Sequence, residues 1–280
     1  MIKIDAHQHF WEFDAIRDAW IDDSMQVIRK DFLPDDLQPT LSINGIAGCV
    51  AVQADQSEKE TNFLLDLASK NDFIKGVVGW VDLVTEDIEE RLSHFSSNKL
   101  LKGVRHIAQG EADDFLLRDD FQRGISHLET YGLTYDLLVY AHQLPAAIQL
   151  AKKFPNQKFV LDHIAKPKIS EGLDVGWSSN IKSLAECPNV YCKLSGMVTE
   201  TTNFEWEKKI FHPFMELVTE AFGINRIMYG SDWPVCLLAA NYEEQLEIVE
   251  SYINTYSATE QDRIMGANAI DFYDLSSELI

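Results

Sequence analysis

The stretch Ile4–Trp11 (IDAHQHFW) decides how this chain is interpreted. A short β-like run ends there in two histidines that are separated by one residue. Because side chains alternate across a strand, His7 and His9 are predicted to share one face. Two imidazoles at the end of a strand are suitable ligands for a borderline metal ion such as Zn²⁺, whereas a buried core pair is the structural alternative.

Seven more β-like runs follow this stretch and alternate with helix-like stretches. The eight predicted strands are Ile2–His7, Gly48–Gln53, Ile74–Val81, Leu101–Ile107, Leu133–Val139, Lys158–His163, Val190–Ser195 and Arg226–Ser231. The helical patterns between them include Glu58–Lys70, Glu86–Phe95, Phe121–Tyr131, Leu144–Phe154, Trp206–Phe222 and Tyr242–Tyr256. This alternation predicts parallel strands with right-handed crossovers, and eight such units close into a barrel. We therefore predict an α/β fold, a (β/α)8 TIM barrel, as one domain over residues 1–280. An open doubly wound sheet is the rival, but no glycine-rich phosphate loop follows the first two strands.

The composition excludes several classes of partner. The 280 residues include 24 Lys and Arg against 45 Asp and Glu, a formal net charge of −21. A surface this acidic repels phosphate backbones and anionic lipids, so neither nucleic acid nor membrane partners are expected. No signal peptide or bilayer-spanning run is predicted, and four cysteines without Cys-x-x-Cys spacing indicate a cytoplasmic protein with reduced thiols. The oligomeric state is not indicated.

Two further motifs close strands that a barrel would bring beside the first. Phe159–Pro167 (FVLDHIAKP) carries His163, and strand alternation predicts that Asp162 points the other way, toward a neighbouring element. Ile227–Cys236 (IMYGSDWPVC) carries Asp232, whose carboxylate can deprotonate a water or bind a metal ion. Since the carboxyl ends of all strands converge in a barrel, four side chains are predicted to share one pocket. They are His7, His9, His163 and Asp232.

Five stretches give the chain a resemblance to a known family. They are Ile4–Trp11, Gly103–His106, Asp162–Pro167, Lys193–Gly196 and Gly230–Val235. Together they resemble the amidohydrolase superfamily in its amidohydrolase-2 branch, and more closely the sugar lactonases typified by L-fuconolactonase and L-rhamnonolactonase. The 2-pyrone-4,6-dicarboxylate lactonases are cousins. The resemblance implies a hydrolase that acts on the carboxylic ester bond of a sugar (aldono) lactone, such as L-fucono- or L-rhamnonolactone, in carbohydrate metabolism.

The resemblance also implies at most one metal ion. Typical superfamily members carry a fourth-strand Lys or Glu that bridges two metals, whereas the fourth strand here ends in Arg105 and His106. The fifth-strand histidine ligand is also missing, because His142 falls beyond that strand. We expect one divalent ion, zinc first, held by His7, His9, His163 and Asp232. A metal-free mechanism is the alternative.

Lactone hydrolysis assigns roles to particular residues. Asp232 is expected to be the general base, and His163 to stabilise the oxyanion or, like His106, to protonate the leaving alkoxide. Aromatic faces and hydrogen-bonding groups at strand ends are expected to contact the sugar. These residues are Trp11, Gln53, Arg105, His106, Lys193 and Trp233. Since Arg105 alone among eight arginines closes a strand, a neutral sugar lactone is favoured over a pyrone dicarboxylate.

Two other functions remain open. A metal-dependent decarboxylase of the same branch would release CO2 from an aromatic or muconate-type acid. A non-catalytic sugar-acid binding protein would lack its base or its histidines, and all four of these residues are present here. Two long segments follow strands and are expected to form loops at the pocket whatever the function. They are Phe10–Pro34 and Ile164–Trp177.

Overall fold

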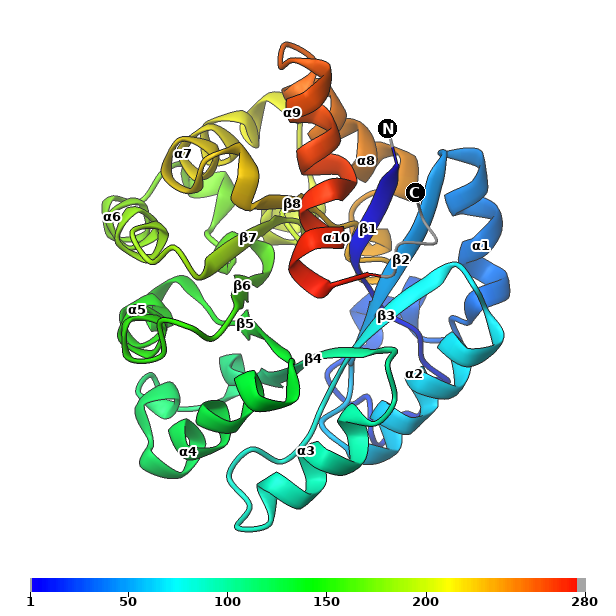
Figure 1. Ribbon diagram of the computed structural model, residues 1–280. Coiled ribbons are helices and arrows are strands. Elements are labelled where there is room, and N and C mark those ends of the chain that lie inside the picture. The colour runs from blue at the N-terminus through cyan, green and yellow to red at the C-terminus, as the bar shows by residue number, and fades with distance from the viewer. Residues whose placement is uncertain (1, 276–280) are drawn as a thin grey trace.

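The strands form a closed ring in sequence order. The computed structural model describes residues 2–275, and in it eight parallel strands pair consecutively from β1 to β8. Their bounds are β1 Lys3–Gln8, β2 Ile46–Val52, β3 Ile74–Gly79, β4 Leu101–Ile107, β5 Thr134–Leu138, β6 Phe159–Leu161, β7 Val190–Leu194 and β8 Ile227–Tyr229. Helices surround this ring (Figure 1). They are α1 Pro34–Ile43, α2 Glu58–Lys70, α3 Ile88–Ser96, α4 Asp119–Leu128, α5 Leu144–Lys153, α6 Val175–Ala185, α7 His212–Phe222, α8 Tyr242–Ile253, α9 Ala258–Asp262 and α10 Asn268–Tyr273. The predicted (β/α)8 barrel is confirmed.

The barrel closes between the end of β1 and the segment that follows β8. The Asp232 N–H donates to the carbonyl of His7 at 2.8 Å, and the His9 N–H donates to the carbonyl of Trp233 at 2.7 Å. These bonds hold the first and the last motif of the sequence against each other. A residue that closes β8 therefore lies beside the histidines of β1.

A register shift in β1 aims its histidines at the barrel interior. Between Asp5 and Gln8 the pairing with β2 shifts by one residue. Asp5 faces outward, where its carboxylate accepts a hydrogen bond from Tyr242 of α8 at 3.0 Å. A regular strand would place His7 on that same side, whereas His7 contacts side chains of β4 and β7 across the barrel. The shift is an irregularity of the kind that re-aims side chains next to functional sites.

The amino-terminal half of the barrel interior is apolar. Its side chains are buried and pack against α10, which lies across this end of the barrel in red in Figure 1. Burial of such a layer contributes about 25 cal/mol for each Å² of apolar surface removed from water. The strand residues of the layer are Ile4, Ala6, Val50, Val52, Val78, Val160 and Met228. The functional groups are therefore confined to the other end, where the strands finish.

Some element boundaries differ from the prediction. The helix predicted over Trp206–Phe222 begins only at His212, because the preceding residues form short turns. The helix α6 begins at Val175, inside the segment that was expected to be a loop. Neither α1 nor α10 was predicted. Within residues 2–275, none of the helices has the length and apolar character needed to cross a bilayer.

Candidate active site

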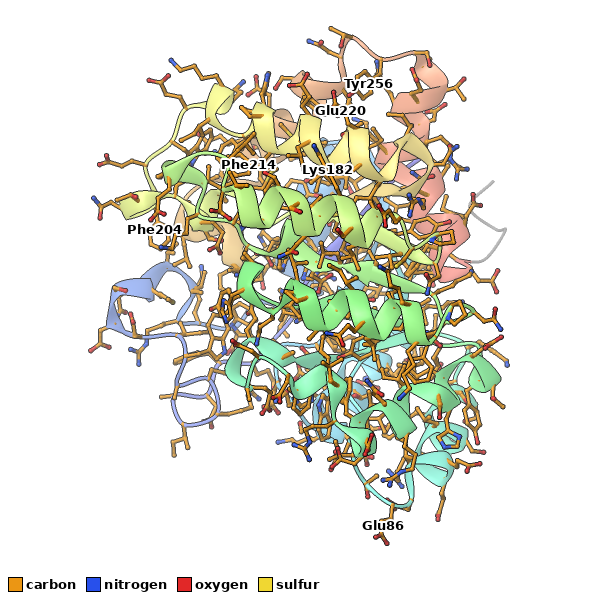
Figure 2. The ribbon with its side chains drawn as sticks, turned by 90° about the vertical axis from the view of Figure 1, so that its left-hand side faces the viewer. Glu86, Lys182, Phe204, Phe214, Glu220 and Tyr256 are labelled. Carbon is orange, nitrogen blue, oxygen red and sulfur yellow. The ribbon has the colours of Figure 1, made fainter. Side chains whose placement is uncertain are left out.

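The carboxyl ends of the strands surround a cavity of about 540 Å³. Its floor carries four polar side chains, which come from the ends of β1, β4, β6 and β8. They are His9, Arg105, His163 and Asp232. Its walls include residues from the segments that follow β1 and β7. Figure 2 shows both segments on the same side of the barrel, with Phe204 at the rim.

Asp232 lies among three imidazoles. Its Oδ1 is 3.3 Å from Nε2 of His9 and 3.8 Å from Nε2 of both His7 and His163. All four side chains are buried. Residues that lie more than 200 positions apart in the sequence thus converge on one point, as the barrel requires.

Each imidazole is held at its other ring nitrogen. Nδ1 of His9 lies 2.8 Å from a backbone carbonyl of β2, which can only accept a hydrogen bond. Nδ1 of His163 lies 2.8 Å from Oγ of Ser195, and Nδ1 of His7 lies 3.3 Å from a carboxylate oxygen of Asp162. The carbonyl favours the tautomer of His9 with a hydrogen on Nδ1, which leaves the lone pair of its Nε2 facing Asp232. The Ser195 hydroxyl can either donate to His163 or accept from it. Metal-binding histidines are commonly oriented by partners of this kind.

The spacing of the donor atoms fits a small divalent ion. A tetrahedral Zn²⁺ with bonds of ~2.0–2.1 Å spaces its ligands by about 3.3 Å. Nε2 of His7 is 3.2 Å from Nε2 of His9, and the latter is 3.3 Å from Oδ1 of Asp232. The second oxygen of Asp232, Oδ2, is buried without a hydrogen-bond partner within residues 2–275. These residues therefore fit a bound metal ion, and a second overlapping group of candidate ligands is His7, Asp162 and His163.

Arg105 adds a permanent positive charge to the same floor. Its Nη1 lies 3.3 Å from Nε2 of His7 and donates to Asp162 at 3.0 Å. Its Nε and Nη2 donate to the side-chain oxygen of Gln53 at 3.2 and 2.9 Å. The guanidinium and a metal ion would thus compete for the same lone pair of His7. The floor offers two sources of positive charge to a polarised carbonyl.

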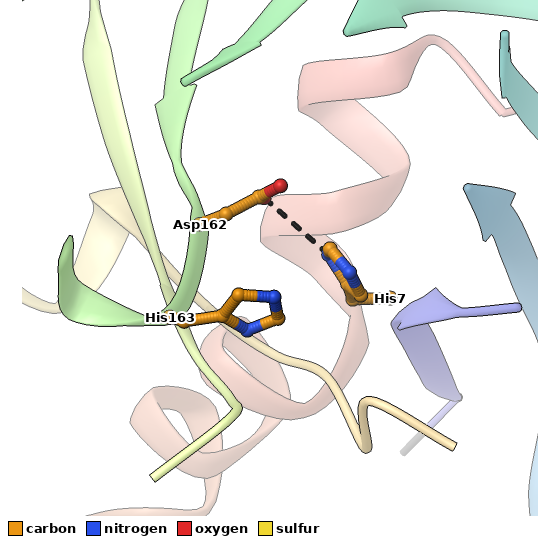
Figure 3. A group of neighbouring side chains, drawn as sticks. All are labelled: His7, Asp162 and His163. Carbon is orange, nitrogen blue, oxygen red and sulfur yellow. Dashed lines mark ion pairs between the residues drawn. The ribbon is translucent and has the colours of Figure 1, made fainter. Parts of the chain in front are cut away.

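Asp162 is a site residue that was expected to face a neighbouring element. Asp162 and His163 both point toward His7 (Figure 3) instead of lying on opposite faces. Val160 faces the barrel interior, so alternation along β6 brings Asp162 to the same side. β6 ends at Leu161, and His163 also reaches this side because the residues from His163 to Lys166 all have positive φ, between 47° and 62°. Alternation applies only to extended chain, and non-glycine residues rarely adopt this conformation because it costs of order 1 kcal/mol or more each. Such strain is characteristic of functional sites.

Gly196 makes room for this turn. A Cβ at this position would lie 2.4 Å from Nδ1 of His163, and Gly196 itself has a φ of +61°. Glycine is the residue that tolerates both the close approach and the left-handed backbone. The segment after β7 therefore supports the imidazole from behind.

A buried ion cluster lies beneath the cavity floor. Nζ of Lys193 is 2.5 Å from Asp136 and 3.0 Å from Asp162, and it is 3.1 Å from Nδ1 of His7. The hydroxyl of Tyr273, on α10, donates to Asp136 at 2.8 Å. Burial raises the pKa of Asp136 to about 6. Burial acts in the same direction on Asp162, but the charges of Lys193 and Arg105 hold the pKa of that carboxyl well below its usual range.

Burial and charge also set the protonation of the floor. Burial lowers the pKa of His163 to about 4 and that of His7 well below its ordinary value. Burial would raise the pKa of Asp232, but the surrounding imidazoles, that of His163 first, hold it below its ordinary value. At neutral pH the carboxylate is therefore ionised, and the imidazoles of His7 and His163 are neutral.

The predicted sugar contacts divide into two groups. Trp11 and Arg105 line the cavity. The other four residues do not, so direct contact with a substrate is not supported for them. Gln53 is engaged by Arg105, and Lys193 is fully buried in the ion cluster. His106 stacks on Phe115 with ring centroids 4.7 Å apart, and Trp233 packs edge-on against Phe32.

Several wall residues were not predicted from the sequence. They are Trp20, Tyr140, Lys166, Glu200 and Phe204. Nζ of Lys166 pairs with Oε1 of Glu200 at 3.1 Å across the cavity wall. Of these residues, Lys166 belongs to a motif that the sequence singles out, because it follows His163 in the stretch that closes the sixth strand.

The chain is similar to known proteins over nearly its whole length. The family model described as Amidohydrolase matches residues 4–275. An L-fucono-1,5-lactonase of Burkholderia multivorans is 38% identical over 290 residues, which cover 98% of this chain and 96% of the relative. An L-fucono-1,5-lactonase of Burkholderia ambifaria is 34% identical, with 97% and 95% covered.

A solved structure extends the likeness to three dimensions. The crystal structure of an amidohydrolase from Burkholderia multivorans with bound zinc superimposes with a TM-score of 0.95. It is 37% identical, and the match covers 99% of this chain and 100% of that chain. The chain therefore belongs to the Amidohydrolase family.

Proposed function

We propose that the protein is a lactonase that hydrolyses a sugar lactone, such as L-fucono- or L-rhamnonolactone, to the open sugar acid. The observation that carries this proposal is the ionised Asp232, beside neutral imidazoles and Arg105 on the cavity floor. One of its oxygens has no hydrogen-bond partner within residues 2–275. Two relatives that match nearly the whole chain are named L-fucono-1,5-lactonase. A relative from Scheffersomyces stipitis that matches 63% of the chain is named L-rhamnono-gamma-lactonase.

The chemistry begins at Asp232. Its carboxylate accepts a proton from a water molecule as the oxygen of that water attacks the lactone carbonyl. The carbonyl oxygen becomes an oxyanion, which Arg105 and His163 are placed to stabilise from the floor. The tetrahedral intermediate then collapses, the ring C–O bond breaks, and the sugar acid forms. When bound by His7, His9, His163 and Asp232, one divalent ion, zinc first, would polarise the carbonyl and lower the pKa of the water.

The balance of charge on the walls favours an uncharged ring. The cavity is lined by two basic side chains, Arg105 and Lys166, and by two carboxylates, Glu200 and Asp232. Lys166 is already paired with Glu200, so no pair of free cations is left to bind a dicarboxylate. Aromatic side chains, Trp11 and others, provide faces against which the apolar side of a sugar ring can pack. All four cysteines are unpaired and buried, which suits a reducing, cytoplasmic setting.

A panel of lactones tests this function. Purified protein with added Zn²⁺ would be incubated with L-fucono-, L-rhamnono- and other aldonolactones in weak buffer that contains a pH indicator. We expect acid release well above the buffer rate for at least one of them. If no lactone is opened faster than in buffer alone, the proposed function is wrong, and CO2 release from aromatic acids would identify a decarboxylase.

Metal binding is tested by elemental analysis. We expect close to one zinc ion per chain after addition of Zn²⁺ and desalting. His9→Ala should lower this occupancy at least ~10-fold in dilute protein, because metal-site changes typically cost 10–100-fold in affinity. His127→Ala, on α4 beside Glu89 of α3, is the control and should bind as the unaltered protein does. Occupancy near zero in the unaltered protein would favour the metal-free mechanism, in which Arg105 and His163 act alone.

A further inference from the structure

The leaving group of a lactone needs a proton. Opening an aldonolactone ring releases an aliphatic alkoxide, which is a strong base and departs readily only when a positioned acid protonates it. The cavity floor does not provide an evident donor. Arg105 cannot release a proton, and Nε2 of both His9 and His163 faces Asp232. His106 lies outside the cavity.

Lys166 is a basic side chain on the cavity wall with a transferable proton. It ends the left-handed turn that begins at His163, and its N–H donates to the carbonyl of His163 at 2.8 Å. This turn holds the base of the Lys166 side chain close to the imidazole of the floor. The side chain is largely buried, with 17% of its surface exposed, and it lines the same cavity as Asp232.

Glu200 fixes the position of this ammonium group. Its Oε1 lies 3.1 Å from Nζ of Lys166 and comes from the segment after β7, on the other side of the turn. This ion pair keeps the ammonium charged at neutral pH. An aliphatic alkoxide is still more basic, so transfer of the proton to it is favourable.

We propose that Lys166 donates a proton to the ring oxygen as the C–O bond of the lactone breaks, with Glu200 as its positioning residue. The inference rests on the lactonase function proposed above. One proton passes from water to Asp232 while the water oxygen bonds to the carbonyl carbon. A second proton passes from Lys166 to the leaving oxygen, which becomes the hydroxyl of the sugar acid. Asp232 then loses its proton to solvent and Lys166 regains one, so the sum is lactone plus water to hydroxy acid.

The basicity of the leaving group provides the test. A phenolate is a good leaving group that needs little protonation, because its conjugate acid has a pKa of ~10. Lys166→Met should therefore lower kcat for a sugar lactone ~10²–10³-fold. The same variant should change kcat for dihydrocoumarin, a lactone with a phenolate leaving group, less than ~5-fold. Retained turnover of dihydrocoumarin also shows that the variant is folded.

Three further variants complete the experiment. Lys168→Met removes an exposed lysine two residues away and should leave both activities unchanged. Glu200→Gln should cause a smaller loss that is confined to the sugar lactone. Tyr140→Phe removes a phenol proton on the wall and should cause no selective loss. If Lys166→Met does not fold, Glu200→Gln provides the test. A loss of activity on the sugar lactone alone supports the proposal, and the absence of such a loss overturns it.

The outcomes separate this proposal from the function on which it rests. Equal losses on both substrates would make Lys166 an oxyanion-stabilising group and overturn proton donation, as would a selective loss in Tyr140→Phe. If the unaltered protein does not open dihydrocoumarin, methylamine is added to Lys166→Met as a replacement proton donor. Restored sugar-lactone turnover supports proton donation by Lys166, and unrestored turnover overturns it. Inactivity of the unaltered protein on every sugar lactone would instead remove the proposed function.

Discussion

Asp232→Asn is expected to lower kcat for the sugar lactone by about 10³-fold, with little change in the affinity for the substrate. Asparagine keeps the shape of the side chain but cannot accept the proton of the attacking water. It also tolerates the positive φ of 58° at this position better than most residues. The fold should therefore be preserved, and the loss measures the missing base. Steady-state kinetics with the lactone identified from the panel check the prediction.

Two controls accompany this variant. Asp113 lies on the loop after β4, at the same end of the barrel, and its exposed carboxylate pairs with His142. Asp113→Asn removes this carboxylate and should leave kcat unchanged. The zinc content of Asp232→Asn separates loss of the base from loss of a ligand, since the carboxylate is proposed to serve both. If turnover persists within ~10-fold of the unaltered protein, Asp232 is not the base.

Lys193→Met is expected to lower the free energy of unfolding by about 3–5 kcal/mol at pH 8. The substitution leaves Asp136 and Asp162 buried without the ammonium that lies 2.5 and 3.0 Å from them. Two carboxylates in an interior of low dielectric then repel each other and have lost their solvent. Denaturant unfolding that is followed by fluorescence measures the difference.

The deficit of Lys193→Met should depend on pH. In the unaltered protein, burial raises the pKa of Asp136 from 3.8 to about 6, so the native state binds more protons than the unfolded state between these values. Stability due to this group is present at low pH and is lost as the pH rises through that window. Loss of Lys193 should raise the pKa of native Asp136 further above its value in the unfolded state. The difference in unfolding free energy between Lys193→Met and the unaltered protein should therefore grow from pH 5 to pH 8.

Two comparisons make this stability prediction specific. Lys182→Met, on the exposed side of α6 (Figure 2), should stay within ~0.5 kcal/mol of the unaltered protein. A double variant that adds Asp136→Asn to Lys193→Met should recover part of the loss, because one unpaired charge is removed. Equal stability of Lys193→Met and the unaltered protein at pH 8 would contradict the ion cluster.

Much of the fold could be predicted from the sequence because short β-like runs alternate with helical patterns along the whole chain. The strand predicted over Leu101–Ile107 has those bounds in the structure, and the other seven predictions overlap their strands. The predicted strands that contain His163 and Ser231 are too long, since the chain turns sooner at both places. The helix α10 was not predicted because its six residues are too few to show a helical period.

Site residues at the end of a strand could be predicted from the sequence. Those whose orientation depends on the turn after the strand were harder to predict. His7, His9, His163 and Asp232 were expected together because the barrel gathers strand ends. Asp162 and His163 share a side because four consecutive residues from His163 have positive φ, and no residue in that run is a glycine that would signal it. Lys193 was expected at the substrate, but its burial depends on Asp136 and Tyr273, which lie far away in the sequence.

The most direct measurement is a crystal structure of Asp232→Asn grown with a sugar lactone that the unaltered protein hydrolyses. The account predicts an unopened ring in the cavity, with its carbonyl carbon facing Asn at position 232 and its ring oxygen toward Lys166. A lactone that is bound elsewhere, or one whose carbonyl faces away from the three imidazoles, would contradict it.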